Sequence, residues 1–309
     1  MRLGISITSD HAGIDPAEAT RRVIERAQAA AAANLDHLSL GDHHSVGPSG
    51  SYVQNVPMIG RIMADWPANR SLGLLLLLPL WNPVLAAEQI GTLAAMSDAR
   101  FIVQTGIGGG KSQFDGMGVE LRRRGSVTDE AIEVMKRLFA GEVVDNETFG
   151  ITGAAINPRP PQPVEWWIGS GTGDAPLERA ARDGDVWYVS PGITLADLAP
   201  AIERYRDRCS HYGTTPRVAL RRDVFVADDD GAAVTTGEQI IAGGYRGMSP
   251  EVLVFGGVER VVDALAPFAA IGVDDIVART ATAGGVVTAT EAVRSIDLLG
   301  AVREQLAAV

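Results

Sequence analysis

The apolar run from Leu72 to Leu78 is the clearest hydrophobic pattern in the chain, because it stops at Pro79 and is followed by a helical pattern that begins at Pro83. A strand with one exposed face would alternate apolar and polar residues, and a helix that spans a bilayer needs about 20 apolar residues. The run therefore predicts a short strand buried on both faces, which is typical of a parallel sheet covered by helices. Trp81 is then expected where this strand leaves the sheet.

Short apolar runs of this kind alternate with helical patterns along the whole chain. The predicted strands cover residues 3–8, 37–41, 72–78, 101–106, 165–169, 185–189, 218–227 and 274–278. The predicted helices cover residues 16–33, 54–65, 84–97, 127–140, 175–183, 195–212, 258–270 and 290–308. Eight strand–helix units predict a closed (β/α)8 TIM barrel, and the glycine fingerprint of an open dinucleotide-binding sheet does not follow Thr8. We expect one such domain over residues 1–309.

Two connections between the predicted elements are longer than the rest. An insertion between strands 4 and 5 is expected over about residues 141–163, where Gly150, Gly153 and the prolines from Pro158 to Pro161 interrupt regular structure. A second excursion is expected over about residues 228–250. Both segments are candidates for lids over one end of the barrel.

Composition narrows the classes of partner. A formal charge of −11 disfavours a nucleic-acid partner, which would need a basic face. The amino-terminal segment lacks the pattern of a signal peptide, and no apolar run is long enough to be a membrane anchor. The single cysteine, Cys209, lies in a predicted helix without an adjacent base, which favours a buried structural thiol over a nucleophile. We expect a cytoplasmic enzyme with no membrane partner.

The triplet Asp42–His43–His44 follows the second predicted strand, at the barrel end where active sites are built. One interpretation is a metal site, as in a metal-dependent hydrolase, but its ligands would have to converge from several strand ends. The other histidines are His11, His37 and His211, and their positions do not favour that arrangement. We expect no metal. A purely structural histidine pair remains open beside the preferred interpretation, in which the pair faces a substrate or cofactor.

Two glycine-rich turns follow predicted strands. In the first, Gly106–Lys111, backbone N–H groups can cradle an anion while Lys111 supplies charge. The second, Gly169–Asp174, opens a predicted helix whose free N–H groups favour a phosphate. The alternative for the second is a tight turn in which Asp174 caps the helix. Neither turn matches a P-loop.

Four stretches resemble, in order and spacing, the bacterial luciferase-like flavin-dependent monooxygenases and their deazaflavin-dependent relatives. They are Gly41–His44; Leu78–Val84 with Ala87–Gln89; Arg100–Phe101 with Gly106–Gly108 and Phe114–Gly118; and Asn157–Pro163 before Trp167–Gly169. This resemblance covers residues 1 to about 190. It implies a (β/α)8 barrel with one large insertion, in a homodimer that holds reduced FMN or the deazaflavin coenzyme F420 at the carboxyl ends of the strands.

The resemblance also implies roles for individual residues. His43 is similar to the family's active-site histidine, which acts beside the flavin as an acid, a base or a hydrogen-bond donor. Leu74–Leu75 matches the place where many members have a cis non-prolyl bulge behind the flavin ring. The turn from Ser170 to Gly173 is similar to the family's phosphate-binding loop, with Thr172 and Gly173 the best-matched positions.

The chain departs from the family pattern at two positions. Asp42 stands where luciferases have a glutamate, and Lys111 stands where deazaflavin-dependent sugar-phosphate dehydrogenases have an acidic catalytic residue. A cation cannot replace that acid, but it can contact a cofactor phosphate. We therefore prefer FMN to F420.

The expected activity is that of a two-component monooxygenase that uses O2 and reduced FMN, supplied by a separate NAD(P)H:flavin reductase, on a small organic substrate. The alternatives are an F420-dependent hydride-transfer oxidoreductase and a non-catalytic flavin-binding protein. The expected catalytic residues are His43, His44 and Trp81. The expected cofactor contacts are Leu74, Leu75, Gly106, Gly108, Lys111, Gly169, Ser170, Gly171, Thr172 and Gly173.

Overall fold

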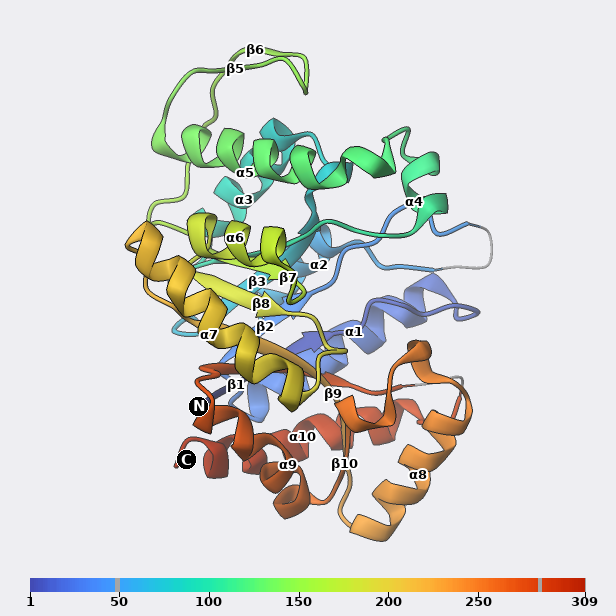
Figure 1. Cartoon of the computed structure of the whole chain (residues 1–309). Coiled ribbons are helices and arrows are strands. Elements are labelled where there is room, and N and C mark those ends of the chain that lie inside the picture. The colour runs from blue at the N-terminus through green and yellow to red at the C-terminus, as the bar shows by residue number, and fades with distance from the viewer. Residues whose placement is uncertain (48–50, 283–284, 309) are drawn as a thin grey trace.

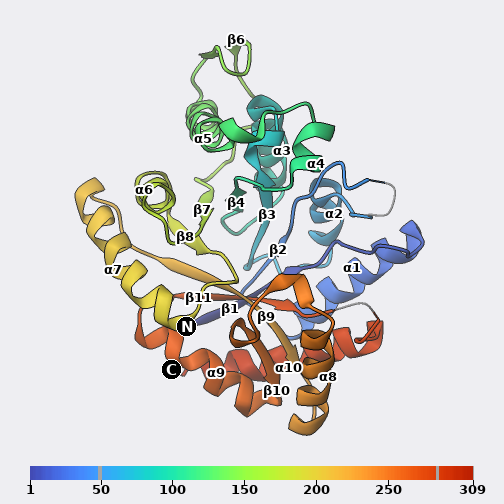
Figure 2. The same cartoon turned by 45° about the vertical axis from the view of Figure 1, so that its right-hand side comes forward.

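Eight parallel strands form a closed barrel in the computed structural model, which describes residues 1–47, 51–282 and 285–308. The strands are β1 (Arg2–Ile7), β2 (His37–Leu40), β3 (Ser71–Leu77), β4 (Ile102–Gly106), β7 (Glu165–Ser170), β8 (Val186–Val189), β9 (Val218–Val226) and β11 (Asp275–Thr280). Each pairs with the next, and β11 pairs with β1 to close the ring (Figure 2). The predicted (β/α)8 barrel is confirmed, and all eight predicted strands coincide with these.

Helices surround the barrel (Figure 1). They are α1 (Pro16–Ala32), α2 (Asn55–Ile62), α3 (Pro83–Ala95), α5 (Arg124–Ala140), α6 (Asp174–Asp183), α7 (Leu195–Tyr212), α9 (Val258–Ala270) and α10 (Ala289–Leu306). The start of α3 shows how local sequence fixes these boundaries. Asn82 Oδ1 accepts hydrogen bonds from the N–H groups of Val84 and Leu85, and Pro83 occupies a first-turn position that needs no N–H donor.

Strand β3 shows why the run of leucines is buried on both faces. Leu72, Leu74 and Leu76 belong to the main core between the strands and the helices. Leu75, on the opposite face, packs against a smaller apolar cluster inside the barrel that includes Trp167. The barrel interior below the mouth is therefore filled with side chains, as is usual for an eight-stranded barrel.

The floor of the barrel, at the amino ends of the strands, is packed around His37. Gly4 makes room for the imidazole, since a Cβ on Gly4 would lie 2.1 Å from His37 Cε1. The ring also meets Trp167 edge-on, with centroids 5.0 Å apart. Cys209, which we expected to be a buried structural thiol, is fully buried in α7.

Several elements were not predicted. They are α4 (Lys111–Gly116), α8 (Asp230–Ala242), β10 (Leu253–Gly256), the hairpin β5 (Val144–Asn146) with β6 (Ile151–Ala154), and the short 3-10 helices η1 (Leu78–Leu80), η2 (Leu121–Arg123), η3 (Tyr245–Gly247) and η4 (Pro250–Val252). Helix α8 contains glycines and β-branched residues that form helices poorly in isolation. Gly237 packs closely against the Phe255 ring of β10, so tertiary contacts rather than propensity hold this helix.

The two predicted excursions differ in position. Residues 141–163 contain the β5–β6 hairpin, which lies on the outer side of α5 at the top of Figure 1. Residues 228–250 contain the whole of α8 and of η3. The expected cis bond at Leu74–Leu75 is wrong. Both residues lie in β3, paired in unbroken register with β4, and the cis peptide bond found within the described ranges joins Asn157 to Pro158.

Candidate active site

Two adjoining cavities open at the carboxyl ends of the strands. The Ser170 cavity has a volume of about 330 Å3 and is bounded by the ends of β4, β7 and β8. The His43 cavity has a volume of about 260 Å3 and is bounded by the ends of β1, β2 and β11. Residues shared by both linings are Ser6, Gly41, Leu75, Gly108 and Arg221. The two cavities therefore form one continuous candidate site.

The Ser170 cavity brings the two predicted glycine turns together. Gly106 and Gly108 line it from the turn after β4, and Gly169 to Gly171 line it from the turn after β7. A side chain on Gly169 is excluded, since its Cβ would lie 2.0 Å from the Thr105 carbonyl oxygen. At their glycines both turns thus present bare backbone to the same cavity, which allows close approach of a flat, phosphate-bearing ligand.

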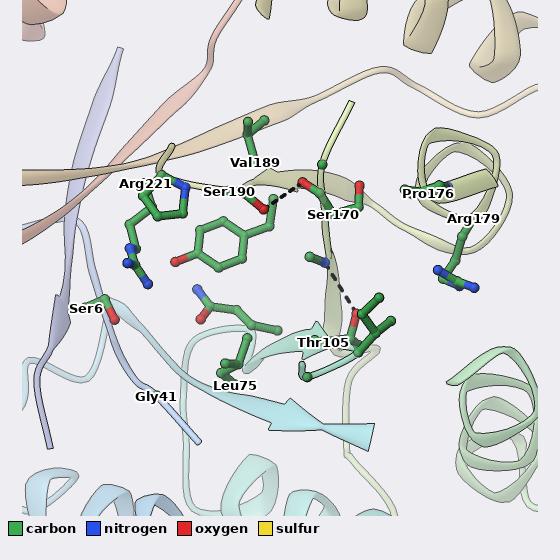
Figure 3. Close-up of a pocket in the computed structure, with 18 residues that line it drawn as sticks. Ser6, Gly41, Leu75, Thr105, Ser170, Pro176, Arg179, Val189, Ser190 and Arg221 are labelled. Atoms are coloured by element: carbon green, nitrogen blue, oxygen red, sulfur yellow. Dashed lines mark hydrogen bonds between the residues drawn. The ribbon is translucent and has the colours of Figure 1, made fainter. Parts of the chain in front are cut away.

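Ser170 is the polar side chain best placed for a ligand in this cavity. Its hydroxyl is buried and has no hydrogen-bond partner, while its carbonyl oxygen accepts from Ser190 Oγ at 3.2 Å (Figure 3). A buried hydroxyl without a partner is costly unless a ligand or water satisfies it. The expected alternative, an Asp174 cap, is wrong. The N-cap of α6 is Gly173, and the Asp174 carboxylate instead pairs with Arg208 at 2.7 Å.

Four of the expected cofactor contacts, Leu74, Lys111, Thr172 and Gly173, lie outside the lining of both cavities. The Thr172 carbonyl oxygen accepts from Arg204 at 2.7 Å, and neither Thr172 nor Gly173 lines either cavity. The Lys111 side chain is 78% exposed and pairs with Asp115 at 2.5 Å in α4. Their contacts with a cofactor stay predictions without support from this geometry. Leu75 does line both cavities, whereas Leu74 points outward into the main core.

A residue that the sequence did not reveal, Arg179, also lines the Ser170 cavity. It lies in α6, opposite Arg221 and Ser6 in Figure 3. Its guanidinium forms a bidentate pair with Asp129 at 2.8 and 2.9 Å. The contact depends on how α6 packs against α5, which no local pattern in the sequence indicates.

His43 is the expected catalytic residue that lines the mouth. Its ring stacks on Tyr52, with centroids 4.3 Å apart and an angle of 22° between the planes. Nδ1 lies 3.2 Å from the Asp42 carbonyl oxygen. Burial raises the pKa of the Tyr52 phenol, and the negative charge of Asp10 adds to this effect. Tyr52 is a second residue of the site that sequence reasoning missed.

His44 and Trp81 lie behind the cavity wall, around the carboxylate of Asp42. Asp42 Oδ2 accepts from the Leu77 N–H at 2.7 Å and from the Trp81 indole N–H at 2.8 Å. His44 Nε2 lies 3.0 Å from Asp42 Oδ1, outside normal hydrogen-bond geometry, and its ring meets Trp81 edge-on. Trp81 lines a separate outer groove, shared with Phe149 of the β5–β6 connection. This arrangement favours a structural role for His44 and Trp81, and their catalytic role stays a prediction.

A cluster of charged side chains, here called the mouth arginine cluster, lies beside the His43 cavity. It consists of Arg221, Arg246 and Arg279 around the buried carboxylate of Asp223. Burial by itself would raise the pKa of Asp223, but the three guanidinium charges hold it below its usual value. Arg221 and Asp223 are two residues apart in a predicted strand and therefore share one face, and this spacing is the signal in the sequence that could have revealed the cluster.

Over residues 1–47, 51–282 and 285–308, no group of three or more His, Cys, Asp or Glu side chains is arranged to hold a metal ion. No helix in the same ranges combines the length and the apolar character that a bilayer-spanning segment needs.

Curated proteins of two mycobacteria are similar to about half of this chain. Uncharacterized proteins of Mycobacterium bovis and Mycobacterium tuberculosis are each 31% identical over 155 residues, which are 49% of this chain and 53% of the relative. The chain thus matches about half the length of these curated relatives.

Solved structures show the same fold over nearly the whole chain. Monooxygenase RslO1 from Streptomyces bottropensis is 19% identical, with a TM-score of 0.80 over 97% of this chain and 98% of its own. The FMN complex of the oxygenating constituent of 3,6-diketocamphane monooxygenase from Pseudomonas putida is 16% identical, with a TM-score of 0.76 over 99% and 98%. An F420-dependent secondary alcohol dehydrogenase is also 16% identical, with a TM-score of 0.76 over 98% and 99%.

The family comparison covers more of the chain than the curated relatives do. Residues 1–301 match the model of the luciferase-like monooxygenase family. The chain therefore belongs to the luciferase-like monooxygenase family and is an enzyme of that family.

Proposed function

We propose that the protein is a flavin-dependent monooxygenase of the two-component type, which uses reduced FMN and O2 to oxidise a small organic substrate. The supporting observation is the Ser170 cavity, which two glycine-rich turns and the unpartnered buried hydroxyl of Ser170 line together. In this proposal a separate NAD(P)H:flavin reductase supplies the reduced FMN, and the enzyme is a homodimer.

The residues of the Ser170 cavity fit the chemistry of FMN. The Ser170 hydroxyl and the backbone of Gly171, which both line this cavity, would bind the phosphate. Leu75 and the backbone from Gly106 to Gly108 offer a wall without charge for the ring. When bound, reduced FMN supplies the electrons that activate O2.

His43 has the proton-transfer role in this proposal. With Nδ1–H donating to the Asp42 carbonyl oxygen, Nε2 is the ring nitrogen left to accept a proton or a hydrogen bond. Stacking on Tyr52 fixes the plane of the ring. The Leu75 and Leu77 side chains at the same cavity help to exclude water, which would otherwise compete for the reactive centre.

A second candidate function is hydride transfer with coenzyme F420. It is favoured by the likeness to the F420-dependent alcohol dehydrogenase, and it would use the same cavity without oxygen chemistry. His43 would then act as the acid or base for the substrate oxygen.

Cofactor titration separates these candidates. The purified full chain would be mixed with reduced FMN and, separately, reduced F420 without oxygen, and binding followed by fluorescence. FMN binding, with oxygen consumption that depends on both a flavin reductase and NADH, is the expected result. Preference for F420 would replace the proposal with the second candidate. Tight FMN binding without turnover of any substrate would identify a flavin-binding protein instead.

A further inference from the structure

The mouth arginine cluster has more positive than negative charge. Asp223 Oδ2 accepts from Arg246 Nη1 at 3.0 Å, Arg279 Nη1 at 3.1 Å and the Tyr245 hydroxyl at 2.7 Å. Arg221 Nε lies 3.3 Å from Asp223 Oδ1. Three guanidinium groups thus surround one carboxylate. The excess charge is local, since the chain as a whole has a formal charge of −11.

Several donors of this cluster are not used within the protein. Arg221 Nε and Nη2 are buried and have no hydrogen-bond partner. Each guanidinium carries five N–H donors, and the contacts with Asp223, Tyr245 and Thr8 occupy only part of them. Buried donors of this kind are stabilised when an acceptor fills the space in front of them.

The other side chains around the His43 cavity also favour an anion. Arg221, Arg246 and Arg279 all line it, together with hydroxyl groups of Ser6, Thr8 and Tyr52. The Asp42 carboxylate is held by Leu77 N–H and by the Trp81 indole. Asp10 is exposed to solvent beyond Tyr52. The cavity therefore offers mainly donors and positive charge, close to His43.

The cluster also lies away from the turn proposed for the cofactor phosphate. Arg221 and Ser6 stand on one side of the Ser170 cavity, and Ser170 stands on the other (Figure 3). Arg246 and Arg279 line the His43 cavity and not the Ser170 cavity. A flavin phosphate bound at Ser170 would leave the arginines for a second anion.

Resting on the proposed function, we infer that the substrate is a small organic anion, a carboxylate or sulfonate, whose charged group binds the mouth arginine cluster. The remainder of the substrate then lies beside His43 and next to the cavity proposed for the flavin. Arg221 and Arg246 are specificity-determining residues, because planar guanidinium groups bind carboxylate and sulfonate oxygens in pairs.

Calorimetric titration with matched probes tests this inference. Benzoate and benzenesulfonate carry the charge, and benzamide is the neutral isostere of benzoate. For the native full chain we expect benzoate to bind about tenfold more tightly than benzamide, the usual scale for hydrogen bonds to a charged group. We expect this preference to fall as the salt concentration rises.

Two variants test whether the mouth arginine cluster binds the charged group of the probe. Arg246→Gln changes a rim side chain that is 40% exposed, and we expect it to weaken benzoate binding about tenfold while leaving benzamide binding unchanged. Arg221→Gln is expected to weaken benzoate binding further. The matched control is Arg61→Gln on α2, which removes the same charge from an exposed pair with Asp65 and should leave both probes unaffected. Thermal unfolding of each variant checks folding, and Arg246→Gln carries the test if Arg221→Gln does not fold.

The outcomes distinguish this inference from the proposed function. Equal affinity of the native protein for benzoate and benzamide overturns it, as does the absence of arginine-dependent binding of either anion at millimolar concentration. If Arg246→Gln weakens reduced FMN binding but not benzoate binding, the cluster holds the cofactor phosphate instead and the inference is wrong. Failure of native protein to bind FMN, with arginine-dependent benzoate binding retained, refutes the cofactor assignment alone.

Discussion

The two ends of the barrel use the same kinds of charged side chain in different proportions. At the floor, the carboxylates of Asp275 and Glu165 meet the guanidinium groups of Arg2 and Arg217. At the mouth, three arginines share the single carboxylate of Asp223. A balanced network inside a protein satisfies itself, whereas an unbalanced one needs a further partner. This difference favours a structural role for the floor network and supports the inferred ligand-binding role of the mouth network.

The burial of the two carboxylates strengthens this comparison. Asp275 and Asp223 are both fully buried. Burial alone would raise the pKa of Asp275, but His37 and Arg2 lower it below its usual value. The same opposition acts on Asp223 through the mouth arginines. The charged form of each carboxylate is therefore the form that the fold stabilises, and only the mouth has positive charge left over.

Asp275→Asn should have the largest effect on stability. It removes the buried charge that Arg2 contacts at 2.6 Å and leaves the Arg2 guanidinium, which is 45% exposed, without its partner. Loss of one member of a fully buried pair costs about 3–5 kcal/mol, and the partial exposure of Arg2 places this variant at the lower end of that range. Urea unfolding measures this loss, with the exposed Asp65→Asn as the control. A loss below about 1 kcal/mol would be the value for a surface pair and would contradict the structural interpretation of the floor.

His43→Ala should show the opposite behaviour, with a large effect on activity and a small effect on stability. Acid–base groups contribute about 10²-fold or more to turnover, while His43 is only partly buried. Turnover by the native enzyme and the variant would be compared under identical reduced-flavin supply. His44→Ala is the control on the structural side of Asp42, and we expect it to lower stability more than His43→Ala does. Unchanged turnover in His43→Ala would remove this residue from the mechanism.

Ser170→Ala tests the proposed contact between the Ser170 hydroxyl and the cofactor phosphate in the Ser170 cavity. Loss of one hydrogen bond to a charged phosphate should weaken FMN binding about tenfold, or about 1.4 kcal/mol. Riboflavin, which lacks the phosphate, should bind the native protein and the variant alike. Equal weakening of both ligands would show that the Ser170 hydroxyl contacts something other than the phosphate.

Acid titration of stability compares the two buried carboxylates directly. Because the folded pKa of Asp275 is lowered, its contribution is fully present above its unfolded pKa of about 3.9 and is lost as the pH falls through the folded value. The stability difference between the native protein and Asp275→Asn should therefore shrink as the pH is lowered from about 5 toward 2. The unfolding free energy measured across this range checks the sign. A difference that grows toward low pH would contradict a lowered pKa.

Lys111→Ala should have the smallest effect. The side chain is mostly exposed and pairs with Asp115 in the same helix, a contact worth about 0.3–0.5 kcal/mol. We expect FMN affinity to change less than about twofold, within the range of a screened surface charge. Fluorescence titration measures it. A tenfold loss would restore the predicted contact between Lys111 and the cofactor phosphate.

Periodicity predicted most of the fold. The eight strands and eight of the helices carry their own patterns, because burial on both faces gives continuous apolar runs and covering helices give amphipathic ones. Helix α8 and strand β10 depend on each other, through Gly237 and Phe255, and no local pattern predicts such a pair. The expected excursion over 228–250 turned out to be mainly this helix, and η3 within it brings Arg246 to the mouth.

The candidate site was only partly predictable. The sequence placed His43, Gly106 and Ser170 at the mouth, because residues after parallel strands converge there. It did not reveal Tyr52, Arg179 or the arginine cluster, which depend on packing between distant segments. Lys111 and Thr172 fall outside both cavities, since the direction of a side chain in a loop is not encoded in spacing.

The packed floor around His37 and Trp167 has a consequence for traffic through the enzyme. The His37 imidazole fills the space beside Gly4, and the Trp167 indole packs with Leu75. The barrel is therefore closed at its floor and open only at its mouth. Under the proposed function, cofactor, substrate and product enter and leave at the same end of the barrel, so a bound flavin would narrow the path of the substrate that follows it. The closed floor would in this way impose an order on cofactor binding, substrate binding and product release.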